Sequence, residues 1–244
     1  MKRKRTDSNA ELADYWSRAA TRSGKASLNL RTRSKRITWN AVIGTTVVLK
    51  RLFDILVSGF ALIALAPLYA ITALLIKTED PGPVFFKQNR VGLKGQPFLI
   101  WKFRSMINDA EKVAQLMIDQ DQAKDTIEMK LAGDPRVTRV GRIIRKYSID
   151  ELPQFWNVFI GNMSIVGPRP VVPIEVAEYT VEERQRLLAK PGLTCFWQLG
   201  GRTDLDFDNQ VRLDVEYIRS SSLWLDIKLL FLTVPAVLLG KGAY

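Results

Sequence analysis

Histidine is absent from the 244 residues, and Cys195 is the single cysteine. Without histidine the chain has no Ser-His-Asp or Cys-His nucleophile system, no His-ligated zinc and no histidine general base. One cysteine forms no internal disulfide and no CxxC pair. Neither a Walker A run nor GxGxxG occurs, which excludes nucleotide binding by those loops. Catalytic groups must therefore be found among carboxylates, Lys, Tyr and Cys195. Of these, Cys195 lies among apolar neighbours, and we expect it to be an inert packing residue.

Positive charge is concentrated at the N-terminus. Lys+Arg 36 against Asp+Glu 25 gives +11, and residues 1–36 alone hold eleven basic against three acidic residues, or +8. So polar a segment buries too little apolar surface to fold alone, and we expect a basic, disordered tail over residues 1–40. Anionic membrane lipids are its expected partner. A secretory signal does not fit, because about forty polar residues precede the first long apolar run.

The run from Ile55 to Ile76 contains no charged residue and is long enough to span a bilayer. Pro67 interrupts it, so we expect two helical pieces of about a dozen and nine residues, each too short to cross alone. Both flanks are rich in Lys and Arg, which favours a hairpin that returns to the cytoplasmic side. We therefore predict a monotopic, re-entrant helical segment over residues 41–77. A proline-kinked single span is the alternative.

A second apolar segment, residues 223–239, is interrupted by Asp226, Lys228 and Pro235. This pattern is typical of an amphipathic helix that lies in the membrane interface, with Trp224 at headgroup level. It is equally compatible with a core helix of the globular part. We assign residues 223–244 to an interfacial C-terminal helix.

Residues 78–222 are expected to form a cytoplasmic catalytic head of α+β class, mostly helical. Turn residues and short apolar stretches predict a small β-hairpin, and polar periodic stretches predict helices. The expected strands cover 84–86 and 97–101 around a loop at 91–95, and the expected helices cover 109–130 and 137–147.

Asp150 and Glu151 are adjacent acids that follow Arg145 and Lys146. Two carboxylates among cations suit phosphate chemistry, since one can hold Mg²⁺ while the other attacks phosphorus. The same residues fit a second interpretation, because Ser148-x-x-Glu151 matches a helix capping box. At this point both interpretations stay open.

Further basic and aromatic residues each allow two interpretations. Arg169 lies between two prolines, so it is either a rigid phosphate clamp or an exposed turn residue. Lys102 and Arg104 alternate along a strand, which usually produces a solvated face. Phe196 and Trp197 could shape a sugar or nucleobase pocket, or pack in the core.

Several ordered segments together resemble one family, the bacterial sugar transferases. These monotopic phosphoglycosyl transferases, or polyprenyl-phosphate hexose-1-phosphate transferases, begin exopolysaccharide and glycan assembly, and the likeness is to the exopolysaccharide-initiating type. It covers about four-fifths of the chain and is carried by KRLFD at 50–54, PGPVFFKQ at 81–88, KFRSM at 102–106, DELPQ at 150–154, MSIVGPRP at 163–170 and KPGLT at 190–194.

The resemblance implies transfer of hexose-1-phosphate from UDP-glucose or UDP-galactose to undecaprenyl phosphate, with release of UMP and a requirement for Mg²⁺. By the same resemblance Asp150 is the nucleophile that forms a covalent aspartyl phosphosugar, and Glu151 is the Mg²⁺ ligand. The residues expected to contact phosphates are Lys102, Arg145 and Arg169. Pro67 matches the helix break of the family's re-entrant helix, although Ala66 stands where serine is common.

These expectations place the protein in the bacterial inner membrane, with its catalytic head on the cytoplasmic face. A homo-oligomer is compatible with the sequence, and nucleic acid is not an expected partner. Two other functions stay open. The first is a membrane-anchored scaffold or binding protein with a basic tail, in which the two acids only cap a helix. The second is a hydrolase of polyprenyl diphosphates.

Overall fold

The computed structural model describes residues 46–110, 112–113, 134–199 and 205–238. The predicted tail over 1–40, residues 114–130 of the predicted helix and the last six residues lie outside the described residues. The chain divides into two units, residues 1–49 and residues 50–244. The predicted membrane segment from Lys50 onward thus belongs to the same compact unit as the head.

Two helices, Thr46–Ala64 and α3 (Ala66–Glu79), are bent by 58° at the break between them. Pro67 lies in the first turn of α3 and has no N–H to donate to the carbonyl four residues earlier, which explains the break. Both helices are longer than predicted, because charged residues at the ends of the apolar run are also helical. Among the described residues this bent pair is long and apolar enough to cross a membrane only if both helices are taken together.

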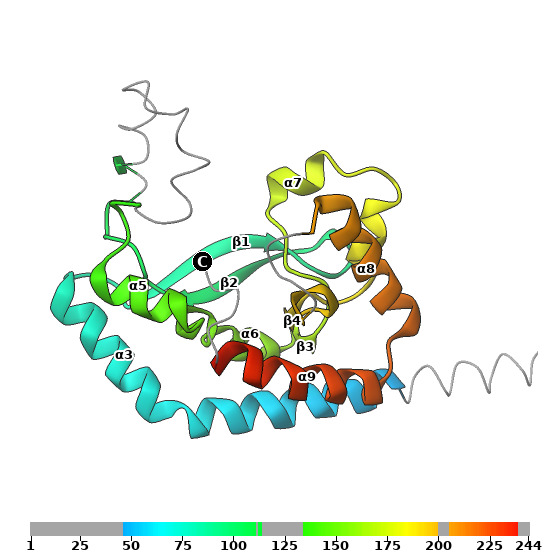
Figure 1. The fold of residues 1–244 in the computed structure, drawn as a ribbon, viewed down its shortest axis with the longest axis horizontal. Coiled ribbons are helices and arrows are strands. Elements are labelled where there is room, and N and C mark those ends of the chain that lie inside the picture. Colours follow the sequence, from blue (N-terminus) through cyan, green and yellow to red (C-terminus); the bar gives the residue numbers. More distant parts are fainter. Residues whose placement is uncertain (1–45, 111, 114–133, 200–204, 239–244) are drawn as a thin grey trace, which may run out of the picture. The chain divides into compact units, whose positions relative to one another are not determined.

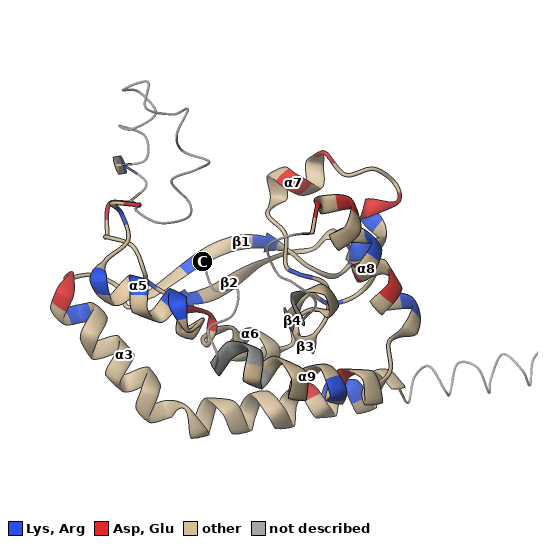
Figure 2. Ribbon diagram, in the orientation of Figure 1, with Lys and Arg blue, Asp and Glu red and all other residues tan. Residues whose placement is uncertain are grey.

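The outer face of the bent pair is apolar and exposed. Between its charged ends it carries neither Lys, Arg, Asp nor Glu from Ile55 to Ile76 (Figure 2). Contiguous exposed apolar side chains on this scale mark a membrane or protein interaction surface. The large exposed side chains are Leu52, Leu56, Phe60, Ile63, Ile71, Leu74 and Leu75.

The predicted β-hairpin is present and longer than expected (Figure 1). Strands β1 (Phe85–Val91) and β2 (Pro97–Phe103) pair antiparallel around a turn that contains the 3₁₀ segment Leu93–Gly95. A second, smaller sheet joins β3 (Ser164–Val166) and β4 (Gly192–Thr194) in parallel. Its three-residue strands were not predicted.

Helices make up most of the remaining described structure, which confirms the predicted mostly helical α+β class. The predicted helix over 137–147 is α5. The helical elements are α5 (Arg139–Lys146), η4 (Ile149–Glu151), α6 (Gln154–Ile160), α7 (Pro173–Ala177), η5 (Glu183–Leu188), η6 (Phe196–Leu199), α8 (Phe207–Ser220) and α9 (Leu223–Leu238).

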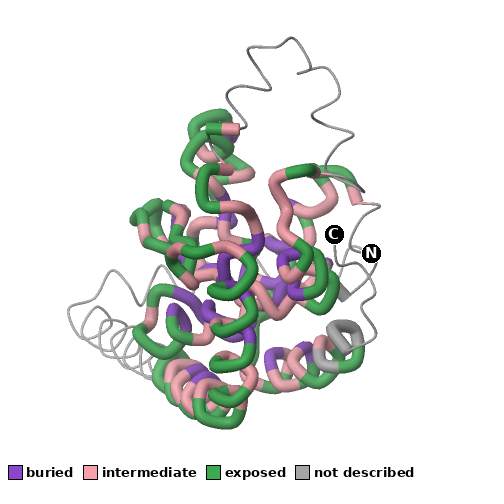
Figure 3. The backbone as a smooth tube through the Cα atoms, turned by 90° about the vertical axis from the view of Figure 1, so that its left-hand side faces the viewer, coloured by how far each residue is buried: buried purple, intermediate pink, exposed green. Residues whose placement is uncertain are grey.

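The main core lies between β2, α6, β3, α8 and α9, and buried positions gather at the centre of the head (Figure 3). Cys195 and Trp197 are both buried, so packing accounts for them, as predicted for Cys195. Phe196 packs against the same core. The fully enclosed members of the core are Ile100, Val158, Met163, Ile165, Val166, Tyr217 and Leu229.

Helix α9 has two different faces, and each matches one of the interpretations of its sequence. Leu229 packs in the core and Asp226 is buried, whereas Trp224 and Phe231 are exposed. One face therefore holds the helix to the head. The other presents an indole and a phenyl ring, as expected for a helix at a membrane interface.

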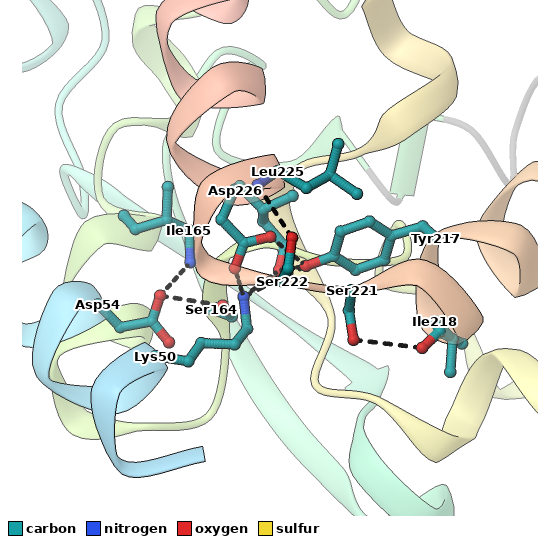
Figure 4. A network of polar contacts seen from close by, with 11 residues as sticks. Lys50, Asp54, Ser164, Ile165, Tyr217, Ile218, Ser221, Ser222, Leu225 and Asp226 are labelled. Carbon is teal, nitrogen blue, oxygen red and sulfur yellow. Dashed lines mark hydrogen bonds and ion pairs between the residues drawn. The ribbon is translucent and has the colours of Figure 1, made fainter. Parts of the chain in front are cut away.

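A buried polar network fastens α9 and β3 to the first helix of the bent pair (Figure 4). Lys50 Nζ forms an ion pair with Asp226 and donates to a backbone carbonyl of β3 at 3.1 Å. Tyr217 O–H donates to Asp226 Oδ1 at 2.6 Å. One turn further along, Asp54 accepts hydrogen bonds from Ser164 Oγ and from the backbone of β3, both at 2.9 Å. Lys50, one of the basic residues that precede the apolar run, therefore serves the fold.

Removal of Lys50 should destabilise the protein strongly, because Asp226 would be left as a buried charge without its cation. For Lys50→Met we expect a loss of about 3 kcal/mol in the free energy of unfolding. The double variant Lys50→Met/Asp226→Asn should recover most of it, since no uncompensated charge remains. Thermal and urea unfolding in detergent measure both values. Lys77→Met is the control, because Lys77 is exposed at the far end of the bent pair; equal losses at Lys50 and Lys77 would contradict this account.

Candidate active site

Asp150 and Glu151 lie in η4, the short helical turn between α5 and α6. Ser148 adopts a left-handed backbone conformation with φ 54° and makes no side-chain capping hydrogen bond. The capping box is therefore not formed, and this interpretation of the two acids is wrong. Instead Glu151 Oε1 accepts a hydrogen bond from Lys102 Nζ at 2.7 Å, across 49 residues of sequence. Figure 2 shows basic segments of α5 and β2 close to this acidic turn.

Arg145 reaches the site because α5 packs closely against the residues that follow β2. A Cβ at Gly141 would lie 1.9 Å from the Ser105 carbonyl oxygen, so only glycine allows this approach. One turn later Arg145 Nε donates to Ser105 Oγ at 2.8 Å. The start of α5 is capped twice, by Thr138 Oγ1 and by Glu79 at the end of α3, whose carboxylate accepts two backbone N–H bonds. The bent helix pair thus fixes the helix that carries Arg145.

Lys102 is held in place by contacts between β2 and α6. Asn157 of α6 is fully buried and bonds the free edge of β2 twice. Its Oδ1 accepts from the Trp101 backbone at 2.9 Å, and its Nδ2 donates to the Leu99 carbonyl at 2.7 Å. The strand that carries Lys102 and the helix that follows the two acids therefore form one rigid frame.

Asp150 is the most strongly perturbed carboxyl group of the site. Burial raises its pKa to about 6, and the adjacent negative charge of Glu151 acts in the same direction. The positive charges of Lys102 and Arg145 oppose this shift. The carboxyl group is thus largely ionised at neutral pH yet poorly solvated, which suits a nucleophile.

Arg169 is exposed on the turn between β3 and α7, where the backbone is held from two sides. Gly167 N–H donates to the Thr194 carbonyl at 3.0 Å, and Gly192 N–H donates to the Pro168 carbonyl at 2.8 Å. Burial lowers the pKa of Arg90, at the end of β1, and the charge of Arg169 lowers it further, whereas the charges of Glu175 and Glu151 raise it. Arg90 therefore lies close to Arg169 as well as to these two acids.

Arg104 has a different role from Lys102, and a solvated face for both is wrong. Its side chain is 7% exposed and bonds the backbone carbonyl of Asp80, which caps the end of α3. It also lies 3.6 Å from the Asp80 carboxylate. Arg104 therefore joins the hairpin to the bent pair and does not face the two acids.

Asp150 and Glu151 suit a magnesium ion that takes its other ligands from the substrate. No group of three His, Cys, Asp or Glu that could hold a metal occurs among the described residues. Mg²⁺ commonly binds proteins through one or two carboxylates plus substrate phosphates and water. Glu151 offers carboxylate oxygen, the ligand type that Mg²⁺ prefers, at the position where Lys102 already places a positive charge.

The structure brings two of the three cations that the sequence singled out for phosphate chemistry to the two acids. Lys102 contacts Glu151 directly, and the charge of Arg145 acts on Asp150. Arg169 lies on a separate turn, which the bond from Arg90 to the Pro170 carbonyl joins to β1. Sequence reasoning missed the groups that position them: Glu79, Arg90, Ser105 and Asn157. Only Arg90 left a signal, since Gln88-x-Arg90 places two polar residues on one face of a strand.

Comparison with known proteins gives consistent matches. The family described as "Bacterial sugar transferase" matches residues 45–240. The exopolysaccharide production protein ExoY of Sinorhizobium fredii is 42% identical over 198 residues, which is 80% of this chain and 88% of ExoY. The undecaprenyl-phosphate galactose phosphotransferase of Salmonella typhimurium is 44% identical over 199 residues, 80% of this chain and 42% of that protein. The undecaprenyl-phosphate glucose phosphotransferase of Komagataeibacter xylinus is 44% identical over 206 residues, which is 80% of this chain and 37% of that protein. The chain thus spans most of ExoY but less than half of the other two.

Replacement of Asp150 should stabilise the folded protein at neutral pH. Because its pKa is about 6 when folded and 3.8 ordinarily, ionisation of this group costs the folded state up to about 3 kcal/mol above pH 6. Asp150→Asn removes that cost, so its melting temperature at pH 7.5 without added Mg²⁺ should exceed that of the wild type by several degrees. The gain should shrink as the pH falls through 6 and vanish below about 4.

Glu178→Gln is the control, because Glu178 is exposed and the substitution removes one negative charge in the same way. A lower melting temperature for Asp150→Asn than for the wild type at pH 7.5 would show that the folded state does not disfavour the charge on Asp150.

Proposed function

Since the chain belongs to the bacterial sugar transferase family, we propose that it transfers hexose-1-phosphate from a UDP-sugar to undecaprenyl phosphate and releases UMP. The observation that carries this proposal is the half-buried carboxyl group of Asp150, with cations from β2 and α5 acting on it. Relatives named as glucose or galactose phosphotransferases support UDP-glucose or UDP-galactose as the donor. The name of ExoY supports a role in exopolysaccharide synthesis, of which this reaction would be the first membrane step.

The first step uses Asp150 as the nucleophile. A carboxylate oxygen attacks the phosphorus that bears the hexose, the bond from that phosphorus to the bridging oxygen breaks, and UMP leaves with the electron pair. A phosphohexose then remains attached to Asp150 through an acyl phosphate. Lys102 and Arg145 stabilise the negative charge on the phosphoryl oxygens as the phosphorus is attacked.

In the second step the lipid takes up the phosphohexose. A phosphate oxygen of undecaprenyl phosphate attacks the same phosphorus and displaces the Asp150 carboxylate, which gives the lipid diphosphate hexose and restores the enzyme. A covalent intermediate lets a water-soluble donor and a membrane acceptor use one site in turn. When bound through Glu151, Mg²⁺ would supply charge neutralisation for the diphosphate.

A membrane location at the cytoplasmic face of the inner membrane agrees with this reaction. The bent pair has an exposed apolar surface and charged residues at both ends, as expected for a re-entrant hairpin that returns to the same side. Its charged ends contact the head through Glu79 and Arg51, the latter by bonds of 2.7 Å to two carbonyls at the end of α6. Anionic lipids are proposed partners of the basic tail, which lies outside the described residues.

Release of UMP by the purified protein tests the proposed reaction. With undecaprenyl phosphate, Mg²⁺ and either UDP-glucose or UDP-galactose, the wild type should release UMP and form a lipid-linked product. Asp150→Asn should lower the rate at least about 1,000-fold, because no nucleophile remains. Glu178→Gln, on the exposed side of α7, should leave it unchanged. Release of inorganic phosphate without need of a nucleotide sugar would indicate the hydrolase instead.

The rate of UMP release should fall as the pH falls, because only the ionised form of Asp150 attacks. With its pKa at about 6, the rate should drop about tenfold per pH unit below that value. A cation beside the carboxylate favours ionisation, so saturating Mg²⁺ should move the inflection to lower pH. Initial rates between pH 5 and 8, with the fold checked at each pH, measure this. A rate that rises from pH 7 to pH 5 would mean that Asp150 acts as an acid.

A further inference from the structure

Arg90 lies at the end of β1 and is so far without a role in the reaction. The hairpin register pairs Phe86 with Lys102 and Arg90 with Phe98, so Arg90 and Lys102 share one face of the hairpin. Gln88, on the same face, accepts from Arg90 Nη2 at 2.7 Å. The Arg90 side chain is therefore held in place on the face of the hairpin that also carries Lys102, the lysine bonded to Glu151.

The other end of the Arg90 guanidinium holds the turn that presents Arg169. Nη1 donates to the Pro170 carbonyl at 3.2 Å, directly after Arg169. The next residues are also joined, because Val91 N–H donates to the Val171 carbonyl at 2.9 Å. Arg90 thus adds a side-chain contact to a turn that β4 fixes from its other side.

The charge of Arg90 has no carboxylate partner at ion-pair distance within the described part of the chain. Its half-buried side chain lies near the like charge of Arg169, and the only favourable charges acting on it are those of Glu151 and Glu175. Its Nε is buried without a hydrogen-bond partner among the described residues. Two neighbouring guanidinium groups with so little compensation favour the binding of an anion of high charge.

We propose that Arg90 is a positioning residue for the donor diphosphate, acting through Arg169. It fixes the Arg169 turn at the Pro170 carbonyl and places a second positive charge next to it. Two adjacent guanidinium charges match the two adjacent phosphates of a nucleoside diphosphate sugar better than the single phosphate of the lipid acceptor. This inference rests on the proposed function. It assigns the site formed by Arg90 and Arg169 to binding of the donor UDP-sugar.

The steady-state test compares Arg90→Gln and Arg90→Lys with Lys87→Gln. Lys87→Gln removes the same positive charge from the same strand. Lys87 lies on the other face of that strand, with its Nζ 4.0 Å from the centre of the Trp101 ring. For Arg90→Gln we expect the KM for the UDP-sugar to rise about tenfold, with the KM for undecaprenyl phosphate unchanged. Arg90→Lys keeps the positive charge but loses the two terminal nitrogens of the guanidinium group, so the KM for the UDP-sugar should rise less. Lys87→Gln should change neither constant.

A double variant tests whether Arg90 acts through Arg169. Arg90→Gln/Arg169→Gln should lower kcat/KM for the donor by clearly less than the product of the two single losses, because the part of the Arg90 effect that passes through Arg169 is already lost in Arg169→Gln. Multiplicative losses would overturn the proposal, as would an equal rise in the KM for the lipid. If Arg90→Gln does not fold, Arg90→Lys carries the test with the same expected selectivity for the donor.

Thermal stabilisation by inorganic pyrophosphate provides a readout independent of turnover. Millimolar pyrophosphate should raise the melting temperature of the wild type and of Lys87→Gln, and by at most half as much that of Arg90→Gln. Equal shifts in all three would refute the role of Arg90. An Arg90-dependent shift in a protein that releases no UMP with any donor would refute the proposed function while supporting a diphosphate site at this corner.

Discussion

Two carboxylates side by side in a half-buried turn repel each other, and cations from separate elements must offset that repulsion. Lys102 comes from β2 and Arg145 from α5, and each is held by a further contact, through Asn157 and through Ser105. The balance leaves the pKa of Asp150 at about 6. The group is therefore ionised at neutral pH, and no ion pair to it occurs among the described residues, which agrees with the proposed role as a nucleophile.

The bent helix pair contacts the elements on both sides of this turn. Glu79 caps the start of α5, Tyr69 O–H donates to the Leu152 carbonyl at 2.6 Å just after the two acids, and Arg51 bonds the end of α6. The position of the acids relative to the apolar surface is thus set by hydrogen bonds and not by a linker. An enzyme that joins a water-soluble sugar nucleotide to a membrane lipid requires such a fixed position.

Local patterns predicted the elements well and their roles less well. Short apolar stretches on both sides of a glycine-containing loop predicted the hairpin, and Pro67 predicted the break in the apolar helix. Helix lengths were wrong, because charged residues continue a helix that the apolar run does not delimit. The capping box and the proposed catalytic pair use the same Glu151, so no local pattern separates them. The left-handed backbone of Ser148 and the ion pair of Glu151 with Lys102, 49 residues earlier, exclude the capping box.

The sequence by itself determined the chemistry available to this protein: no histidine, two adjacent acids, an excess of cations, and an apolar run broken by proline. These properties depend on residue types and short spacings. Only the tertiary structure decided which cations serve the site and which serve the fold. Lys50 and Arg104 are held by Asp226 and Asp80, whereas the charges of Lys102, Arg145 and Arg90 interact with the two acids. Pairing and burial depend on contacts between residues far apart in the chain, which no short pattern contains.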